Sequence, residues 1–485
     1  MTTFRLPPCH APSGSRGTHS LVSRLALGVF ALAWTLGAQA FVSVGPNGTF
    51  ATIQQGVAQA IANGGDEVRV QLRCFGCSYG ENVDFDTTVS INLSGGWAAD
   101  FQSQNAVLNS AVTGSDANAP IIRAIARGNA IVSISRFNID GSGVASIGAA
   151  GSSTHGLLVG AWNSSVIVVH DNVISGNVVR TMSGASLVPG GAGIAMQATD
   201  TAVIDIAGNT ILSNQLVGTD SHASYGAGAF VTAIGGGHVD FVLNTISGNI
   251  TSNPNGGACR GGGVWAASLD TSTMQLRGNS YTGNEQLFCN TGATGDAAEI
   301  DGSNTAVIQV YDETWTSNAI PSNPGVYEVY MQTDVSARIF AANGLITHGT
   351  WGGLLANSIA SGQIDISNYT IADNPVLGFR GLGVGTRLVN TVLWGNGDNT
   401  PDVETGATAT FVLFGTDPLF VDAANGNYRL QSGSPAIDAG LDTPIGGLRV
   451  FDLDGAPRPF GNAPDIGAYE YRPDPSDVIF IDGFD

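Results

Sequence analysis

A six-residue motif that recurs along the interior of the chain constrains its fold more than any other feature. The motif has the form Asn-x-(Ile or aromatic)-x-x-Asn, and its clear copies are NVISGN at 172–177, NTILSN at 209–214, NTISGN at 244–249 and NSYTGN at 279–284. Weaker copies are ETWTSN at 313–318, NGLITH at 343–348, YTIADN at 369–374 and LWGN, which ends at Asn396. The last positions of successive copies are 37, 35, 35, 34, 30, 26 and 22 residues apart. Repeats with periods of about 20–50 residues are typical of solenoids and related arrays.

A second motif keeps step with the first. GAGIAM begins at Gly191, GAGAFV at Gly226 and GGGVWA at Gly261, and these copies are again 35 residues apart. Short β-branched runs such as 165–169 and 201–206 fill the intervals, and no helical periodicity separates them. Three short strands per repeat, joined by Gly, Asn and Ser turns, predict an all-β fold made of a single parallel β-helix of about 10–12 coils.

The repeat assigns residues to the core and to the turns. One column of apolar side chains is predicted to stack inside the coils: Ile174, Ile211, Ile246, Tyr281, Trp315, Leu345 and Ile371. The last Asn of each copy suits a turn because Asn tolerates left-handed backbone angles, and stacked amides can hydrogen-bond along a ladder. His348 would take the ladder position in its copy. This structural ladder is predicted to contain Asn177, Asn214, Asn249, Asn284, Asn318, Asn374 and Asn396.

The decreasing repeat length predicts where loops lie. The 22-residue spacing is close to a bare coil of three strands, so the longer repeats carry about 10–15 additional residues as loops. These inserts, at 180–189, 218–225 and 251–260, each follow the Asn motif. We therefore expect them on one side of the solenoid, where loops on a rigid scaffold can carry a binding site.

The first 40 residues have the features of an export signal. Arg16 and Arg24 precede an apolar stretch at 25–37, which ends in the small-x-small sequence 38–40. The stretch is shorter than the ~20 residues that span a membrane as a helix. The sequence therefore predicts a secreted or outer-surface protein without a membrane span in its mature chain.

Four cysteines remain after the export signal. Disulfides are the default state of cysteines in an exported chain, and neither a thioredoxin-like pattern nor a zinc-ligand spacing surrounds them. The predicted pairs are Cys74–Cys77 and Cys259–Cys289.

The charge excludes several function classes. All 18 basic residues are arginine, and 39 acidic residues bring the net charge to −21. The absence of lysine excludes Schiff-base and pyridoxal-phosphate chemistry and the phosphate-binding P-loop. A chain this acidic also lacks the basic face that nucleic-acid binding requires.

Beyond these patterns, the chain resembles known families. The paired glycine and Asn motifs resemble the passenger repeats of polymorphic outer membrane proteins, and segments 48–70, 79–85 and 93–97 resemble the N-terminal cap of pectin-lyase-like right-handed β-helix proteins. Segments 417–440 and 452–471 are similar to the end of bacterial β-helix proteins of the choice-of-anchor type. The resemblance implies a right-handed helix and export, but its families include lyases, hydrolases and adhesins.

Together, the leader, the repeats and the resemblance divide the chain into five parts. They are an export signal at 1–40, an N-terminal cap with the first coils at 41–100, repeats at 101–415, C-terminal coils and cap at 416–471, and a linker with a short tail at 472–485. Ile53, Val57, Ala60 and Ile61 have the spacing of a short capping helix. The tail at 478–485 is similar to short sorting tags of exported bacterial proteins, and the alternative is a strand paired with the last coil.

No motif supports either of the two enzymatic reactions known for the families that the chain resembles. Polygalacturonase-type hydrolysis needs paired aspartates on neighbouring strands, and no Asp-Asp, Gly-His-Gly or Arg-Ile-Lys motif is present. The arginines form no cluster of the lyase pattern, and the histidines have no metal-ligand spacing. No metal or cofactor is therefore expected; calcium at Asp452-x-Asp454-Gly455 is the alternative.

Aromatic residues carry the one positive signal for binding. Leu158, Ala195, Phe230 and Trp265 share one position of the glycine motif. If this position faces outward, Phe230 and Trp265 form a strip for stacking on sugar rings; if it faces inward, they belong to the core. The sequence favours a non-catalytic adhesion or glycan-binding module with an extracellular glycan or cell-surface ligand, and the alternative is a polysaccharide lyase or glycoside hydrolase on the loop-bearing face.

Overall fold

The computed structural model describes residues 41–142, 155–181, 190–219, 221–289, 294–318 and 325–473. The chain divides into two units, Met1–Gln39 and Ala40–Asp485, and every described residue belongs to the second. The export signal predicted at 1–40 and the tail at 478–485 lie outside the described residues. No described helix has the length and hydropathy needed to cross a membrane.

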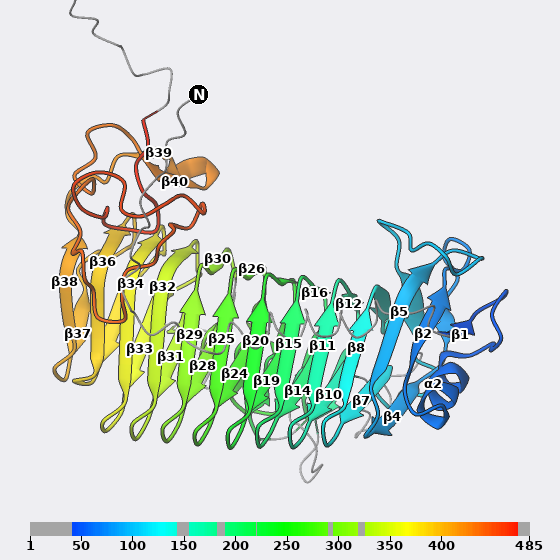
Figure 1. Ribbon diagram of the computed structural model, residues 1–485. Helices are drawn as coiled ribbons and strands as arrows, with labels where there is room; N and C mark the ends of the chain where they lie inside the picture. The colour runs from blue at the N-terminus through cyan, green and yellow to red at the C-terminus, as the bar shows by residue number, and fades with distance from the viewer. Residues whose placement is uncertain are drawn as a thin grey trace, which may run out of the picture. The chain divides into compact units, whose positions relative to one another are not determined.

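Parallel strands build the described unit (Figure 1). Sheet 1 contains β1 (Phe41–Val44), β2 (Asp66–Gln71), β3 (Tyr79–Gly80), β5 (Ile91–Trp97), β6 (Ser110–Thr113), β8 (Ile131–Ser135), β9 (Phe137–Asp140), β11 (Val166–His170), β12 (Val173–Ser175), β15 (Val203–Ala207), β16 (Thr210–Leu212), β20 (His238–Val242), β21 (Thr245–Ser247), β25 (Thr273–Arg277), β26 (Ser280–Thr282), β29 (Val307–Tyr311), β30 (Thr314–Thr316), β32 (Arg338–Thr347), β34 (Gln363–Ala372), β36 (Thr386–Trp394) and β38 (Thr408–Leu413). Sheet 2 contains β4 (Val83–Thr87), β7 (Ile122–Ala126), β10 (Leu157–Ala161), β14 (Ile194–Ala198), β19 (Ala229–Ala233), β24 (Val264–Ser268), β28 (Ala298–Gly302), β31 (Tyr327–Thr333), β33 (Gly352–Ser358), β35 (Leu377–Leu382) and β37 (Asp402–Glu404).

Smaller sheets complete the coils. Sheet 3 contains β13 (Val178–Thr181), β17 (Gln215–Gly218), β22 (Ile250–Ser252) and β27 (Glu285–Leu287). The inserts contribute the parallel pair β18 (Ser224–Tyr225) and β23 (Cys259–Arg260), so the described parts of two inserts lie side by side as expected. The antiparallel pair β39 (Phe420–Asp422) and β40 (Asn427–Leu430) and the 3₁₀ turn η1 (Ala423–Asn425) follow the last coil.

The strand register follows the repeat. Val203, His238 and Thr273 are direct neighbours on β15, β20 and β25, and successive members of this set are 35 residues apart. Every pairing within sheets 1 to 3 is parallel, and sheet 2 has 11 strands, which agrees with the expected number of coils. The predicted all-β parallel β-helix is confirmed.

The apolar column inside the coils follows the prediction with one correction. Ile174, Ile211, Ile246, Tyr281 and Trp315 stack in register and are fully buried. The next member is Ile346, which pairs with Trp315 and then with Ile371. The prediction of Leu345 at this position was wrong by one residue; Leu345 instead packs on the outer side, in a cluster with the C-terminal segment.

The same shift moves His348 out of the ladder. Asn343 has a left-handed φ of 58°, like Asp312 one coil earlier at 61°, so it is a bend residue and the motif in this coil begins at Gly344. His348 also has a positive φ, of 57°, and is exposed, and Gly349 follows it at the ladder position. The predicted motif was placed one residue too early because Asn343 occupies a bend, and both bend and ladder positions favour Asn.

The amide ladder runs through the interior rather than through the turns. The Asn177 Nδ2 donates to the Oδ1 of Asn214 at 2.8 Å, and the chain of bonds continues through Asn249, Asn284 and Asn318. The left-handed residue is the one before each Asn, such as Gly176 at φ 64° and Ser213 at φ 53°. Asn374 and Asn396 form a separate pair at 2.9 Å, because the one intervening coil has Gly349 at the ladder position and Asn318 donates to Glu328 instead. A second ladder that the sequence did not predict contains Asn172, Asn209, Asn244 and Asn279.

Two glutamates end these ladders in the core. Glu313 Oε1 accepts the backbone N–H of Asn279 at 3.1 Å and its side-chain amide at 2.8 Å. Glu328 Oε1 accepts the backbone N–H of Asn318 at 3.1 Å in the same way. Burial raises the pKa of Glu313 and of Glu328 to about 8, so both carboxyl groups bind a proton at neutral pH.

We expect the free energy of unfolding to fall as the pH rises from about 5 to about 8. The folded pKa of each glutamate lies above the ordinary value of 4.5, so this contribution is complete below pH 4.5 and is lost as the pH rises through 8. Urea unfolding followed by circular dichroism across this range checks the slope. A Glu313→Gln/Glu328→Gln variant should show a shallower slope, because Gln keeps the acceptor oxygen without a charge, whereas exposed Glu404→Gln should keep the full slope. Other buried carboxyl groups with raised pKa values, such as Asp205, account for the remaining slope. An unchanged slope in the double variant contradicts the assignment.

A helix closes the N-terminal end of the coils (Figure 1). The Thr52 hydroxyl caps α2 (Ile53–Ala62) by accepting the Gln55 N–H at 3.2 Å. Glu81 accepts the N–H groups of Ile53 and Gln54, where a negative charge is favourable. The predicted residues Ile53, Val57 and Ala60 are fully buried against the first coil, so the helix shields the end of the core from water.

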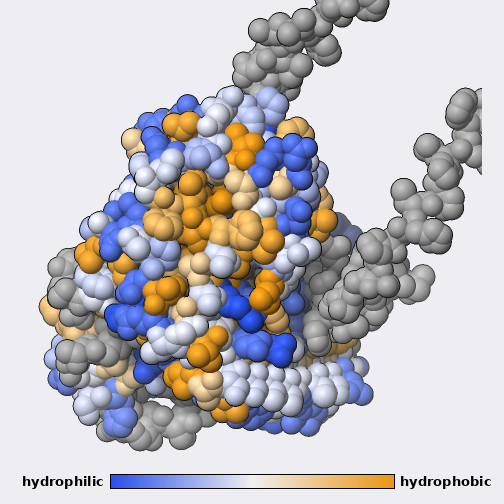
Figure 2. All heavy atoms as spheres, turned by 90° about the vertical axis from the view of Figure 1, so that its left-hand side faces the viewer, coloured by the Kyte–Doolittle hydropathy of each residue, from blue (hydrophilic) through white to orange (hydrophobic). Residues whose placement is uncertain are grey.

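The C-terminal segment folds back along the coils instead of adding to them. Residues 416–473 contribute no strand to sheets 1 to 3. They cover the left-handed bends of β32, β34 and β36, where side-chain amides donate to their carbonyl oxygens: Asn343 to Phe451 at 2.6 Å, Asn368 to Asp465 at 3.2 Å and Asn390 to Leu441 at 3.0 Å. Figure 2 shows the C-terminal end, where apolar side chains remain at the surface; Phe411 is 48% and Phe414 45% exposed.

Candidate functional site

Phe230 and Trp265 lie on the outer side of sheet 2. They alternate with the core residues Ala229 and Val231 on β19 and Val264 and Ala266 on β24. The outward alternative for this repeat position is therefore the observed one. Phe230 is nevertheless 7% exposed, whereas Trp265 is half-buried. Phe230 supports Trp265 and does not present its own ring face to solvent.

Three aromatic rings form a rigid cluster here. The rings of Phe230 and Trp265 stack with centroids 4.8 Å apart, and Tyr225 meets Trp265 edge-on, also at 4.8 Å. Tyr225 belongs to an insert and covers Phe230 at 6.2 Å. The close approach requires glycine at 190, because a Cβ there would overlap the Tyr225 carbonyl oxygen and the Phe230 ring. Gly190, directly before the glycine motif, thus makes room for the insert to fold onto the sheet.

Two carboxyl groups border the cluster. Glu299 follows Trp265 in the same outward column and Asp301 lies two residues further along β28. The Trp265 indole N–H donates to Asp301 at 2.9 Å, and Arg260 pairs with Glu299 at 2.6 Å. Burial raises the pKa of both carboxyl groups. Sequence reasoning missed this pair, although Glu299 stands 34 residues after Trp265 and so shares its repeat position.

A disulfide fixes the insert that carries Arg260. Cys259 on β23 is bonded to Cys289, with Cα atoms 5.6 Å apart. Cys74 and Cys77 form the other bond, with Cα atoms 5.2 Å apart. Disulfides of this kind belong to oxidising compartments. The Cys259–Cys289 bond holds Arg260 against Glu299 and thereby stiffens the border of the aromatic cluster.

Sheet 1 carries a pair of aspartates that the sequence motifs did not reveal. Asp205 and Asp240 are direct neighbours on β15 and β20, and His238 Nε2 lies 3.1 Å from Asp240 Oδ1. Burial and, to a lesser degree, the charge of Asp240 raise the pKa of Asp205 to about 7. Paired aspartates on neighbouring strands are therefore present, contrary to expectation. The signal was their 35-residue separation, which the search for adjacent motifs could not detect.

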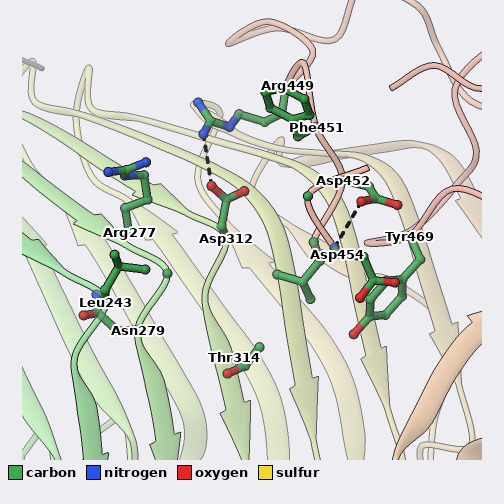
Figure 3. Close-up of a pocket in the computed structure, with 13 residues that line it drawn as sticks. Leu243, Arg277, Asn279, Asp312, Thr314, Arg449, Phe451, Asp452, Asp454 and Tyr469 are labelled. Atoms are coloured by element: carbon green, nitrogen blue, oxygen red, sulfur yellow. Dashed lines mark hydrogen bonds and ion pairs between the residues drawn. The ribbon is translucent and has the colours of Figure 1, made fainter. Parts of the chain in front are cut away.

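A cavity of about 570 Å³ separates the coil bends from the C-terminal segment (Figure 3). Arg277 and Asp312 line it from the coils, and Phe451, Asp454 and Tyr469 line it from the segment. Asp312 accepts from Arg449 at 3.0 Å, and the Arg449 guanidinium lies over the Tyr311 ring at 4.2 Å. No sequence signal indicated this cavity, because its walls come from distant parts of the chain.

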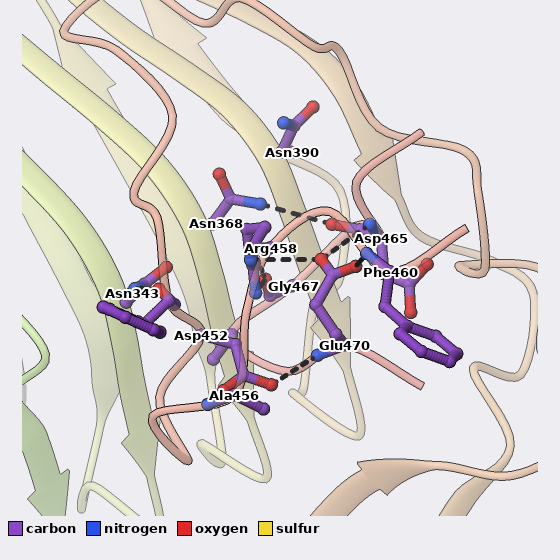
Figure 4. A network of polar contacts seen from close by, with 12 residues as sticks. Asn343, Asn368, Asn390, Asp452, Ala456, Arg458, Phe460, Asp465, Gly467 and Glu470 are labelled. Atoms are coloured by element: carbon purple, nitrogen blue, oxygen red, sulfur yellow. Dashed lines mark hydrogen bonds and ion pairs between the residues drawn. The ribbon is translucent and has the colours of Figure 1, made fainter. Parts of the chain in front are cut away.

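A polar network anchors the segment beside this cavity (Figure 4). Arg458 and Glu470 form a fully buried ion pair at 3.1 Å. Asp452 accepts the backbone N–H groups of Asp454, Ala456 and Glu470 at 2.8 to 3.0 Å. Both oxygens of Asp452, the first residue of the calcium-loop fragment, thus already accept hydrogen bonds. Among the described residues no group of three or more His, Cys, Asp or Glu side chains is placed to hold a metal ion.

The fold and these sites define a parallel β-helix protein with an aromatic and acidic cluster on one outer face. No protein-family model matches the chain, and no curated protein matches it. Among solved structures it is similar to pectate lyase Pel9A, with 12% identity, a TM-score of 0.40 and coverage of 90% of this chain and 98% of that chain. It is also similar to tailspike protein 3 of bacteriophage CBA120, with 11% identity, a TM-score of 0.30 and coverage of 82% and 69%. Likenesses this low assign no function to the chain.

Proposed function

We propose that this protein is an exported surface protein that binds a polysaccharide on the outer face of sheet 2 without cleaving it. One observation carries the proposal: Trp265 is half-buried, stacked on Phe230 and held through its indole N–H by Asp301. A fixed and partly exposed aromatic ring offers an apolar surface at low entropic cost, which suits the apolar face of a sugar.

The neighbouring coils extend this surface with polar groups. Tyr330, Gln332 and Asn357 occupy outward positions on the next strands of sheet 2, and the Asn357 amide lies 3.4 Å from the Tyr330 hydroxyl. Equivalent positions recur about every 4.8 Å along the coils. A row of hydrogen-bonding groups at this spacing favours an extended polymer over a single sugar.

Charge favours a neutral polymer. The chain carries a net charge of −21, which repels polyanions. The proposed ligand is therefore a neutral extracellular glycan, bound beside the disulfide-linked insert.

We expect Trp265→Ala to weaken glycan binding by about tenfold or more, because the residue supplies the stacking surface. A glycan array identifies the ligand, and titration of wild-type and variant protein with that ligand measures the effect. Trp162→Ala is the matched control, since Trp162 is another half-buried tryptophan but lies in the turn after β10. Equal binding by a folded Trp265→Ala variant contradicts the proposal.

A second candidate function is hydrolysis, which the adjacent Asp205 and Asp240 favour. Assays for new reducing ends and for unsaturated products, run on the same glycans, separate the two functions. Binding without product supports the binding module. Product that disappears in Asp205→Asn and Asp240→Asn variants assigns the protein to the hydrolases instead.

A further inference from the structure

We propose that the cavity between the coil bends and the C-terminal segment is a second binding site, which takes a sugar unit bearing a carboxylate and pairs that carboxylate with Arg277. The site is separate from the aromatic cluster, since it lies at the bends of sheet 1 and not on sheet 2. Its walls are joined through the Asp312–Arg449 ion pair, which ties the segment to the coils at 3.0 Å.

The carboxylates in the cavity wall already have partners. Asp312 accepts from Arg449, and Asp454 is paired with Arg429. Asp452 accepts three backbone N–H groups. None of these acids therefore needs a cation from a ligand, and none is available to neutralise Arg277 without giving up a bond.

Arg277 differs from these lining residues because its side chain is unpaired within the described part of the chain. Among the described residues its guanidinium forms no hydrogen bond or ion pair and its Nε is buried without a partner, while its charge interacts with Asp205 on β15 without direct contact. Figure 3 shows Arg277 and Asp312 on the coils, with Arg449 reaching Asp312 from the segment. An arginine with unused donors at a cavity wall is suited to a carboxylate, which accepts two parallel N–H bonds.

The rest of the lining suits a sugar ring. Leu243 and Phe451 are 63% and 53% exposed and give the cavity apolar walls that solvent reaches. Thr314 and Tyr469 bring hydroxyl groups to the same cavity. A volume of about 570 Å³ lies in the range of small-ligand sites. An acidic sugar combines the required carboxylate, hydroxyl groups and apolar ring face.

Calorimetric titration of the full chain with methyl glucuronide, methyl sialoside and neutral methyl glucoside tests the site. We expect the acidic sugars to bind about tenfold or more tightly than the glucoside, and the preferred one of the two identifies the source of the carboxylate. Arg277→Gln should remove this preference. Arg338→Gln, which changes an exposed arginine on β32 outside the cavity, should preserve it.

The outcomes separate this site from the aromatic cluster. Trp265→Ala should retain the preference for acidic sugars even where it loses glycan binding on sheet 2. Equal affinity for neutral and acidic sugars, or an unchanged preference in Arg277→Gln, overturns the proposal. Competition by inorganic phosphate at the same concentration as the sugar also overturns it, because the site would then recognise anions in general.

Discussion

Replacing Trp315 with alanine is expected to lower the free energy of unfolding by about 3–5 kcal/mol. Trp315 is fully buried and is the largest such side chain in the described core. Its ring stacks between Tyr281 at 5.7 Å and Tyr369 at 6.2 Å. Truncation leaves a cavity between two rigid coils, and these cannot close around it because their backbones are bonded to further coils on either side.

Urea unfolding followed by circular dichroism and tryptophan fluorescence measures this loss. Trp162→Ala serves as the control, since it removes a half-buried tryptophan from a turn, where Arg127 lies over its ring at 4.8 Å. The control should cost much less than the core variant. A Trp315→Ala variant with the stability of the control shows that the aromatic stack does not hold the coils together.

Asn249→Ala is expected to destabilise the protein by about 3–5 kcal/mol, although the change removes only a few atoms. Asn249 Oδ1 accepts the backbone N–H and the side-chain amide of Asn214 at 3.0 and 2.9 Å. Its Nδ2 donates to the Ile211 carbonyl oxygen at 3.0 Å and to Asn284 at 2.9 Å. Alanine removes all four bonds. The Asn214 amide keeps its bond to the Ile174 carbonyl oxygen and Asn284 keeps the backbone N–H of residue 249, whereas each buried group left unsatisfied costs about 1–3 kcal/mol.

A matched control for the ladder is Asn118→Ala. Asn118 lies in an exposed turn, where its amide donates to Asp116 at 3.2 Å in contact with water. Its loss should change the urea midpoint by little, since water replaces the missing partner. Equal midpoints for the two variants contradict a stabilising role for the ladder. Because coils can unfold in separate groups, hydrogen exchange at the amides of β22 and β27 localises the effect.

Much of the fold follows from the spacing of the motifs, and the exceptions have physical causes. The core column, except at Leu345, and the Asn residues of the ladder occupy the places that the repeat predicts, because equivalent positions of successive coils must stack. The capping helix instead follows from its own apolar spacing. The error at Leu345 arose at a bend, where Asn343 adopts a left-handed conformation. A bend selects Asn for this conformation, whereas a ladder position selects Asn for its side-chain hydrogen bonds. The repeat pattern alone cannot distinguish two positions that select the same residue type.

The candidate site was predictable only in part. Trp265 was identified because it stands in a repeated motif, but its partners Asp301 and Tyr225 are not repeated. Arg260 reaches Glu299 through an insert whose path depends on the disulfide at Cys259. Such contacts join residues that belong to different parts of the repeat, so periodicity gives no information about them.

By itself the sequence determined the coil, its register and the direction of most side chains, because parallel strands that repeat every 22 to 37 residues bring like positions into contact. Only the tertiary structure decided which outward side chains are covered and which remain open. Tyr225 folds over Phe230 and leaves Trp265 accessible. The C-terminal segment folds back over the bends and encloses a cavity around Arg277. The physical reason is that stacking is local and periodic, whereas covering a surface depends on segments that the repeat does not contain.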